Sequence, residues 1–195
     1  MTDSEELGLR ARLVDAGVEL LEREGPQALT LREIARRAGV SHGAPRRYFP
    51  THLELLSAIA GRGFGELGER VRTVAGDDGA GPREQLAALG RTYLDFALGR
   101  RGMYELMFRH DLLESGHLGL RDTSLPLFGL LVELVGRARP GADARVVAGA
   151  LWANWHGIAQ LWSWGSLRLA TGTNEVTPVL LASLEAHLGP EADGR

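Results

Sequence analysis

Apolar side chains recur every three or four residues along most of the chain, which is the spacing of one face of an α-helix. The pattern is followed at Gly25-Pro26 by residues that end helices, because glycine permits the left-handed turn and proline cannot continue the hydrogen bonding. A first helix is therefore predicted to end at this pair. Its inner face consists of Leu9, Leu13, Ala16, Leu20 and Leu21.

Two capping boxes divide the next part of the chain. Thr30-Leu31-Arg32-Glu33 and Thr51-His52-Leu53-Glu54 each place a threonine three residues before a glutamate, so both side chains can bind free backbone amides at a helix start. Between the two boxes, Gly39 predicts the end of a short second helix. Ser41 is expected to cap a third helix that runs to about Phe49.

The rest of the chain is also predicted to be helical, because no stretch alternates apolar and polar residues as a half-buried strand does. Pro82 suits the first turn of a helix, and Pro140-Gly141 separates two later helices. The fold class is therefore predicted to be all-α, with a three-helix head at residues 5–60 and a helical body at residues 61–195. Helical elements are expected at residues 51–74, 82–96, 103–108, 125–135, 143–170 and 174–188.

Positive charge is concentrated in the head. The chain carries 22 basic residues, all of them arginine, against 25 acidic residues. The absence of lysine beside so much glycine and alanine is typical of a GC-rich coding sequence and does not by itself indicate phosphate binding. From Gln27 to Pro50, however, five arginines stand against Glu33 alone, so a basic patch lies in a chain that is acidic overall.

The composition also excludes several classes of protein. There is no cysteine, so disulfides and thiolate metal sites cannot form. The acidic residues that follow Met1 are the reverse of a basic signal peptide, and no apolar run approaches the ~18 residues of a membrane span. We therefore expect a soluble, cytoplasmic protein that does not enter a membrane.

The stretch GVSHGAPRRYFP, residues 39–50, concentrates residues suited to DNA. Two short helices joined by a glycine turn, the second bearing arginines, are typical of a helix-turn-helix whose second helix lies in the major groove. Arg46 and Arg47 add charge for phosphates, and His42 and Tyr48 can donate hydrogen bonds. Gly43 and Ala44 have almost no side chain, so the backbone can approach the bases closely.

Residues Ala28 to Ile59, ALTLREIARRAGVSHGAPRRYFPTHLELLSAI, resemble the helix-turn-helix signature of the TetR family of bacterial transcriptional regulators. Residues Leu151 to Gly165, LWANWHGIAQLWSWG, resemble the Trp-His-Gly segment of one TetR branch whose regulatory domain is named for it. The resemblance implies a homodimer that binds a palindromic operator in double-stranded DNA. It also implies repression that ends when a small molecule enters the body.

The family's DNA-binding positions carry over residue by residue. Two of them depart from the usual pattern, because Arg46 stands where the family usually has tyrosine and His52 where it usually has a phosphate-binding lysine. Arginine still binds phosphate, whereas a neutral histidine is a weaker anchor. The expected DNA-binding residues are Thr30, Arg32, Ser41, His42, Gly43, Ala44, Arg46, Arg47, Tyr48 and His52.

The tryptophans of the segment 143–170 allow two interpretations. They can fill a core or a dimer interface with large rings, or they can line a pocket in which His156 is the polar group. The second interpretation favours a small, mostly apolar effector, because the lining has no fixed charge and contains adaptable methionines. The expected effector-binding residues are Phe96, Met103, Tyr104, Met107, Phe108, Phe128, Trp152, Trp155 and His156.

Two other functions are conceivable. A helical protein that keeps this fold but has lost DNA binding is consistent with the departures at Arg46 and His52. An enzyme would have to use His110, Asp111, Glu114 and His117, the one cluster with metal-ligand chemistry, but Ser115-Gly116 interrupts the helix that would unite it. We expect a regulator that is not an enzyme and that has neither a metal nor a cofactor.

Overall fold

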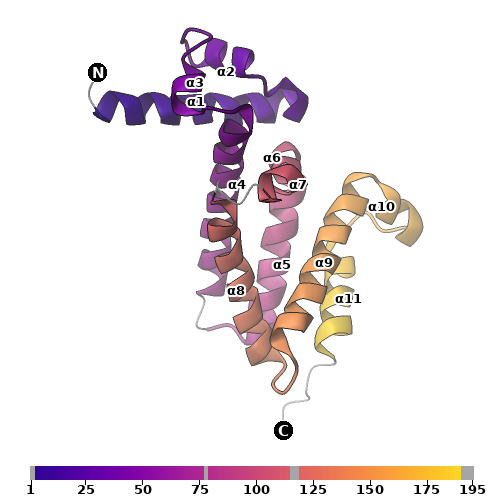
Figure 1. The fold of residues 1–195 in the computed structure, drawn as a ribbon. Coiled ribbons are helices and arrows are strands. Elements are labelled where there is room, and N and C mark those ends of the chain that lie inside the picture. Colours follow the sequence, from indigo (N-terminus) through magenta and orange to yellow (C-terminus); the bar gives the residue numbers. More distant parts are fainter. Residues whose placement is uncertain (1–2, 77–78, 115–118, 190–195) are drawn as a thin grey trace. The chain divides into compact units, whose positions relative to one another are not determined.

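The computed structural model describes residues 3–76, 79–114 and 119–189, and these residues form helices and no strand (Figure 1). The all-α prediction is confirmed. Contacts between residues divide the chain into two units, residues 1–66 with 100–124, and residues 67–99 with 125–195. The chain therefore passes from one unit to the other within α4 (His52–Ala75), after α5 (Pro82–Gly99) and within α8 (Leu120–Ala138).

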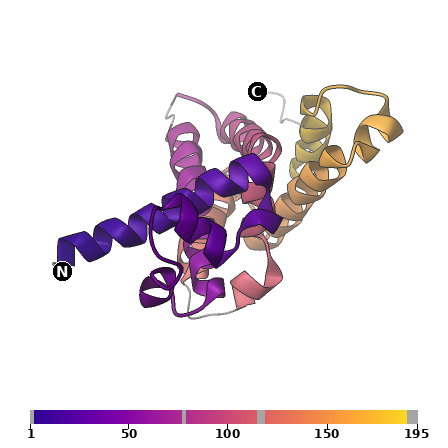
Figure 2. The same ribbon diagram turned by 90° about the horizontal axis from the view of Figure 1, so that it is seen from above.

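The first unit begins with α1 (Asp3–Glu24), which ends where the sequence predicts. Leu13, Leu20 and Leu21 are fully buried or nearly so, and Gly25 takes a φ of 82°, the left-handed conformation that ends the helix. The short 3₁₀-helix η1 (Pro26–Ala28) follows. Helices α2 and α3 pack against α1, as the view from above shows (Figure 2).

Helix α2 (Leu31–Arg37) starts at the predicted cap, since the Thr30 hydroxyl accepts a hydrogen bond from the Glu33 amide at 3.2 Å. The other half of the capping box is wrong: the Glu33 carboxylate binds the guanidinium groups of Arg36 and Arg37. Two arginines one turn further along compete for this carboxylate more strongly than a backbone amide does. Gly39, with a φ of 69°, ends the helix as predicted.

The third helix is shorter than expected. Residues 41–44 form a turn in which the Ser41 carbonyl accepts from the Ala44 amide at 3.0 Å, and α3 spans only Pro45–Tyr48. Ser41 is therefore not the helix cap. Proline lacks an amide hydrogen, so it suits the first position of a helix, where no intrahelical bond is lost. Pro45 is also buried, which fixes the start of α3 at this position.

Helix α4 begins at the second predicted cap, where the Thr51 hydroxyl accepts from the Glu54 amide at 3.1 Å. Its buried face within the first unit includes Leu55, Leu56, Ile59 and Phe64. The same unit contains α6 (Arg101–Met107), α7 (His110–Glu114) and the start of α8, so it is larger than the predicted three-helix head.

The second unit is built on α5, α9 (Ala144–Ser163) and α11 (Thr177–Leu188), which pack together around buried side chains. Gly90 of α5 allows the closest approach, because a Cβ there would lie 2.7 Å from Leu180 and 2.9 Å from the Trp155 ring. The predicted helix over residues 143–170 is wrong in one respect. It breaks at Gly165, which takes a φ of 77°, and α10 (Ser166–Thr171) follows.

Candidate DNA-binding surface and regulatory cluster

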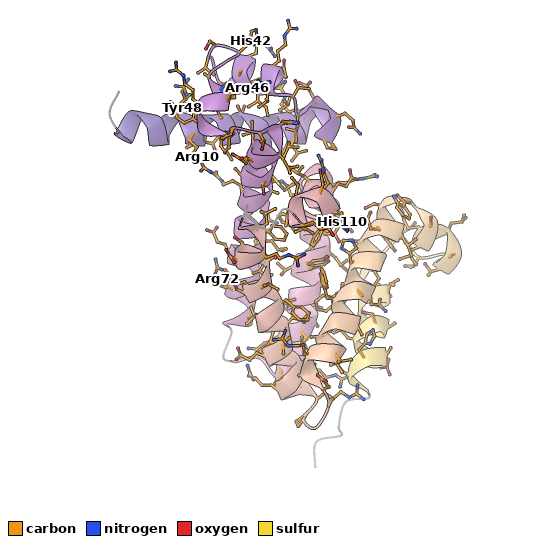
Figure 3. The ribbon with its side chains drawn as sticks, viewed as in Figure 1. Arg10, His42, Arg46, Tyr48, Arg72 and His110 are labelled. Atoms are coloured by element: carbon orange, nitrogen blue, oxygen red, sulfur yellow. The ribbon has the colours of Figure 1, made fainter. Side chains whose placement is uncertain are left out.

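The predicted DNA-binding residues lie at the surface of the first unit. Tyr48 and Ala44 are partly buried, and the other residues are exposed: Thr30, Arg32, Ser41, His42, Gly43, Arg46, Arg47 and His52. Figure 3 places His42, Arg46 and Tyr48 on the side of α1 that carries α2 and α3. Most of the predicted side chains are therefore accessible, and their contact with DNA stays a prediction.

Two arginines of α1 contact the residues that follow α2 and α3. Phe49, which follows the helix, is 1 % exposed, and the Arg10 guanidinium of α1 lies 4.9 Å from the centre of its ring. Arg12 of α1 donates to the Ala38 carbonyl at 2.6 Å, which satisfies the end of α2. Neither arginine was predicted from the sequence, because their partners are 39 and 26 residues away.

The basic patch is smaller than the sequence suggests. Arg36 and Arg37 are paired with Glu33, and Arg37 is also bonded to Glu24 of α1. The hydrogen bond from Arg36 lowers the pKa of the Glu33 carboxyl to about 2, so this carboxylate stays charged. Among the described residues, no ion pair engages Arg32, Arg46 or Arg47, whose charges are available to a ligand.

His52 has a structural bond that the sequence did not reveal. Its Nε2 donates to the carbonyl oxygen of Leu29 at 2.6 Å, across 23 residues. The first residue of α4 is thereby bonded to the segment that precedes α2. His52 is exposed, as a phosphate-binding position must be, but one of its two ring nitrogens is already engaged.

The predicted effector residues do not form one cluster, because the structure divides them between the two units. Met103, Tyr104, Met107 and Phe108 belong to the first unit. There the Tyr104 and Phe108 rings are 4.9 Å apart, and both methionine sulfurs lie within 2.7 Å of the point where a Cβ at Gly63 would stand. α6 and α4 therefore pack tightly at Gly63, and a core role accounts for these methionines.

The remaining residues form an aromatic cluster in the second unit. Trp152 makes edge contacts with Phe128 and His156, with ring centres 6.2 and 6.3 Å apart. A hydrogen bond of 3.2 Å joins His156 Nδ1 to the hydroxyl of Tyr93, and Tyr93 also packs against Trp155. Tyr93 was missing from the predicted lining although it lies on the inner face of its helix. Phe96, the other predicted residue of this unit, is fully buried.

The members of this aromatic cluster differ in exposure. Trp155 is 1 % exposed and is a core residue, whereas Trp152 is 40 % exposed. Burial lowers the pKa of His156 below its ordinary value, because a charged imidazolium would lose hydration there. The ring is therefore neutral at pH 7. The cluster offers apolar surface and neutral polar atoms but no fixed charge.

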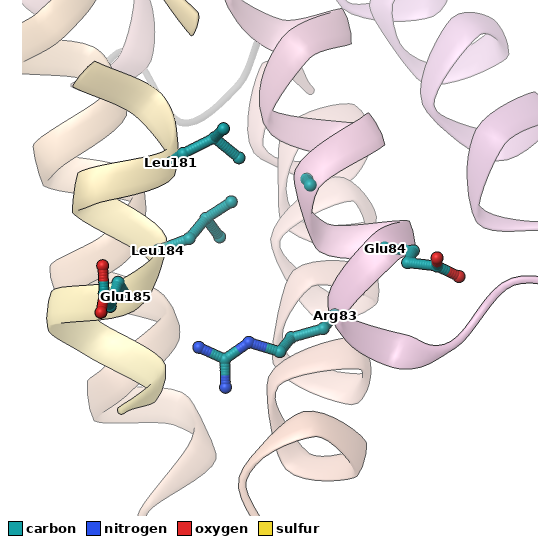
Figure 4. Close-up of a pocket in the computed structure, with 6 residues that line it drawn as sticks. Arg83, Glu84, Leu181, Leu184 and Glu185 are labelled. Carbon is teal, nitrogen blue, oxygen red and sulfur yellow. The ribbon is translucent and has the colours of Figure 1, made fainter. Parts of the chain in front are cut away.

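A separate cavity of about 300 Å³ lies between α5 and α11 (Figure 4). Ala87, Leu181 and Leu184 provide apolar surface, and Arg83, Glu84 and Glu185 complete the lining. Arg83 also donates to the carbonyl of Gly189 at the end of α11. None of the predicted effector residues lines this cavity, so it was not foreseen from the residue pattern.

Of the cluster considered for an enzyme site, His110 and Glu114 lie side by side at the surface, and Asp111 is bonded to Arg109. His110 Nδ1 lies 3.2 Å from a carboxylate oxygen of Glu114, and both side chains are more than 65 % exposed. His117 lies outside the described residues. Within the described parts of the chain, no group of three histidine or acidic side chains is placed to hold a metal ion. No helix there is long and apolar enough to span a membrane.

A head with two short exposed helices on a helical scaffold, attached to further helices, defines a helix-turn-helix transcriptional regulator. Residues 13–59 match the profile of bacterial regulatory proteins of the tetR family. Residues 86–184 match the tetracyclin repressor-like C-terminal domain. The chain belongs to the TetR family of bacterial transcriptional regulators.

Individual relatives agree with this assignment. The transcriptional repressor Rv3405c of Mycobacterium tuberculosis is 28 % identical over 171 residues, which cover 86 % of this chain and 79 % of that protein. A solved Rhodococcus sp. RHA1 protein of unknown function is 30 % identical, with a TM-score of 0.72 over 92 % of this chain and 93 % of the other. A TetR-like regulator from the same organism is 22 % identical, with a TM-score of 0.68 over 93 % and 97 %.

Proposed function

We propose that this chain is a ligand-responsive repressor that binds a palindromic operator as a homodimer. The observation that carries the proposal is the exposed charge of Arg32, Arg46 and Arg47 around Gly43, which no ion pair among the described residues neutralises, on a surface built from α2 and α3. In this proposal residues 5–60 bind DNA, and residues 61–195 bind the effector and the second subunit. The protein regulates transcription and does not catalyse a reaction.

The chemistry of the head supports contacts to both phosphates and bases. Arg46 replaces the family's tyrosine with a charge that binds phosphate through two donors at once. Gly43 and Ala44 lie in the turn before α3, where a small side chain lets the backbone approach the base edges. Ser41 is exposed in the same turn and can donate its hydroxyl to a phosphate.

One face of α9 supports dimerisation. Val146 and Trp164 are 66 and 64 % exposed at its two ends, and Leu161 is 39 % exposed. The residues of this face follow a helical spacing, with large apolar side chains toward both ends and small residues in the middle. They are Val146, Ala150, Ala153, Gly157, Leu161 and Trp164. Such a surface favours a second copy of the chain, because exposed apolar stripes of this length are uncommon on monomers.

The segment Trp155-His156-Gly157 connects these roles, and we propose on this basis that the chain belongs to the Trp-His-Gly branch. Successive residues of a helix point in directions about 100° apart. Trp155 enters the core, His156 meets the hydroxyl of Tyr93, and Gly157 lies on the apolar face, where a Cβ would meet nothing within 4 Å. Three consecutive residues thus serve the core, the effector cluster and the dimer interface.

The effector in this proposal is a small, mostly apolar molecule that carries one or two polar atoms. Trp152 and Phe128 supply ring surface, and the neutral His156 with Tyr93 supplies hydrogen-bonding atoms. An ionic ligand would lose its hydration here without finding an opposite charge. Phe96 and Trp155 are buried in the same unit, whereas Met103, Tyr104, Met107 and Phe108 belong to the first unit and are left out of this site.

The test measures effector and operator together. By linkage, an effector that weakens operator binding by some factor must bind the operator complex more weakly by the same factor, typically ~5- to 150-fold. Calorimetry with apolar aromatic and terpenoid compounds, with and without duplex from the region upstream of the chain's own gene, measures this factor. The proposal would be contradicted if only charged metabolites bound tightly, or if the affinity for the effector were the same with and without the operator.

A second candidate is a helical binding protein of the same fold without DNA binding. The hydrogen bond between His52 and Leu29 favours it, since this bond removes one nitrogen from phosphate binding. A mobility shift with the same duplex separates the two candidates. Retention of the upstream duplex at physiological salt supports the repressor, and its absence together with effector binding supports the second candidate.

A further inference from the structure

We propose that Arg100 is a positioning residue for DNA recognition, because it holds α1 and α4 at a fixed angle through two carboxylates. The proposal rests on the proposed DNA-binding function and concerns how the reading head is held. Arg100 lies between α5 and α6 in a non-helical backbone conformation and is the first residue of the first unit after the chain leaves α5.

The guanidinium of Arg100 binds two acidic residues from different helices. One terminal nitrogen lies 2.9 and 2.8 Å from the two carboxylate oxygens of Glu66 in α4. The other terminal nitrogen binds the carboxylate of Glu22 in α1. The three side chains are 24, 30 and 45 % exposed, respectively, so solvent screens this network less than an open surface pair.

Two further observations indicate that the position of Arg100 is constrained. Its Nε is buried and has no hydrogen-bond partner among the described residues, so the guanidinium binds the two carboxylates through its terminal nitrogens alone. Next to it, a Cβ at Gly102 of α6 would lie 3.2 Å from the carbonyl oxygen of Leu21 in α1. The start of α6 is therefore in close contact with the end of α1.

The angle between α1 and α4 matters because the two helices carry different parts of the DNA-binding surface. α2 and α3 pack against α1, whereas His52 opens α4. The long helix α4 provides one route by which an effector can act on operator binding. Helix α6 contacts α1 and η1, so a movement of α6 can also change the position of α1. Arg100, which precedes α6, connects this second route to α4 through Glu66. Displacement of the α5 end would act directly on this arginine.

The experiment compares Arg100→Met with Arg62→Met in the full chain. Arg62 also joins α4 to α1, through Asp15 at 3.1 Å, but this pair is 61 and 51 % exposed and serves as the matched control. The probe is the duplex from upstream of the chain's own gene. Arg100→Met is expected to weaken its binding roughly 5- to 30-fold, the factor that one or two kcal/mol produces, and Arg62→Met to leave it unchanged.

A distance measurement separates positioning from simple stability. Because the chain has no cysteine, Glu19→Cys in α1 and Gly65→Cys in α4, both in the first unit, can carry spin labels without background, in a mixture with excess unlabelled protein. Double electron–electron resonance measures the distance between the two labels. Arg100→Met is expected to show a broader or shifted distance distribution, and Arg62→Met the wild-type distribution. A conservative Arg100→Lys variant should restore part of the affinity, since one charge can still reach one carboxylate.

Wild-type operator affinity in Arg100→Met overturns the proposal. So does weaker binding together with an unchanged distance distribution, because the arginine would then act on stability alone. If the wild-type chain binds no duplex, the proposed DNA-binding function fails. In that case the distance distribution alone decides whether Arg100 fixes the two helices.

Discussion

Nε2 of His52 lies 2.6 Å from the carbonyl oxygen of Leu29, so the start of α4 is bonded to the segment before α2. A carbonyl oxygen only accepts, so Nε2 carries the hydrogen. In the neutral ring Nδ1 is then an acceptor and has no hydrogen for a phosphate. His52 therefore stabilises the helix-turn-helix at a position where the family resemblance led us to expect a phosphate ligand.

Replacing His52 by lysine is expected to remove the structural hydrogen bond to Leu29 and to add a phosphate contact. If the lysine ammonium binds a phosphate, the dependence of log affinity on log salt should steepen by about one unit. Loss of the bond to Leu29 should lower the free energy of unfolding by ~0.5–1.5 kcal/mol. Salt-dependent operator titrations and urea unfolding measure the two effects, and His52→Gln is the uncharged control. An unchanged salt slope in His52→Lys would show that position 52 does not face the DNA backbone.

Arg46→Ala and Arg47→Ala are each expected to flatten the same salt dependence by about one unit, since each removes one phosphate contact. Arg91→Ala, an exposed arginine on α5, is the control and should leave the slope unchanged. The measurement is operator affinity across a salt series. Wild-type slopes in both head variants would mean that these arginines are merely solvated.

Gly43→Val is expected to abolish specific operator binding without unfolding the head. A Cβ at Gly43 meets nothing within 4 Å in the protein, so the fold accommodates the branched side chain, which in the proposed complex would block close approach to the bases. Gly129→Val on α8, where a Cβ also meets nothing, is the matched control. Circular dichroism checks the fold and a mobility shift checks binding. Normal operator affinity in Gly43→Val would place the turn before α3 away from the bases.

Ala153→Glu is expected to convert the dimer to monomer, because it places a charge in the middle of the apolar face of α9. Deletion of the chain from Asn174 onward, which removes α11, should give monomer or aggregate. Leu125→Glu is the control, since Leu125 is 56 % exposed on α8 and outside this face. Sedimentation velocity measures the state of each variant. Clean dimers in Ala153→Glu and in the truncated chain would exclude this interface.

The stability of the second unit is expected to fall as the pH is lowered from about the ordinary histidine pKa of 6.5, in part because of His156. Its pKa is lower in the folded chain than in the unfolded chain, so the unfolded state takes up the proton first. The contribution is complete above 6.5 and is lost toward the lowered folded pKa. His156→Gln should weaken this acid dependence, whereas the exposed His110→Gln should not. Urea unfolding across pH tests this, and identical profiles for wild type and His156→Gln would contradict it.

Local sequence determined most of the helices of this protein. Thr30 and Thr51 cap helices through bonds to amides three residues away, and Gly25 and Gly39 end helices through their own backbone conformation. Each signal depends on atoms within one turn of the chain, so it can be read without knowledge of distant residues. The family signature at residues 28–59 lies in the same short-range segment, which explains why the class of protein was also predictable.

Local ambiguity accounts for the two helix errors. Pro45 is compatible with either the first turn or the first position of a helix, and its burial decides for the first position. Gly165 is compatible with a continuous helix or with a left-handed turn. The chain adopts the turn, and the following residues leave the axis of α9 as α10. In both cases the local residues allowed two backbone conformations, and the sequence pattern alone did not distinguish them.

Only the tertiary structure decided which charges and rings meet. Arg37 is bonded to Glu24, 13 residues away, and Arg100 joins Glu22 to Glu66, so the charges available to DNA cannot be counted from the sequence. The aromatic residues named as one lining are divided between two units for the same reason. Helical periodicity tells which residues share a face, but the partner of each face is fixed by how the helices pack, and that depends on shape and charge across long stretches of chain.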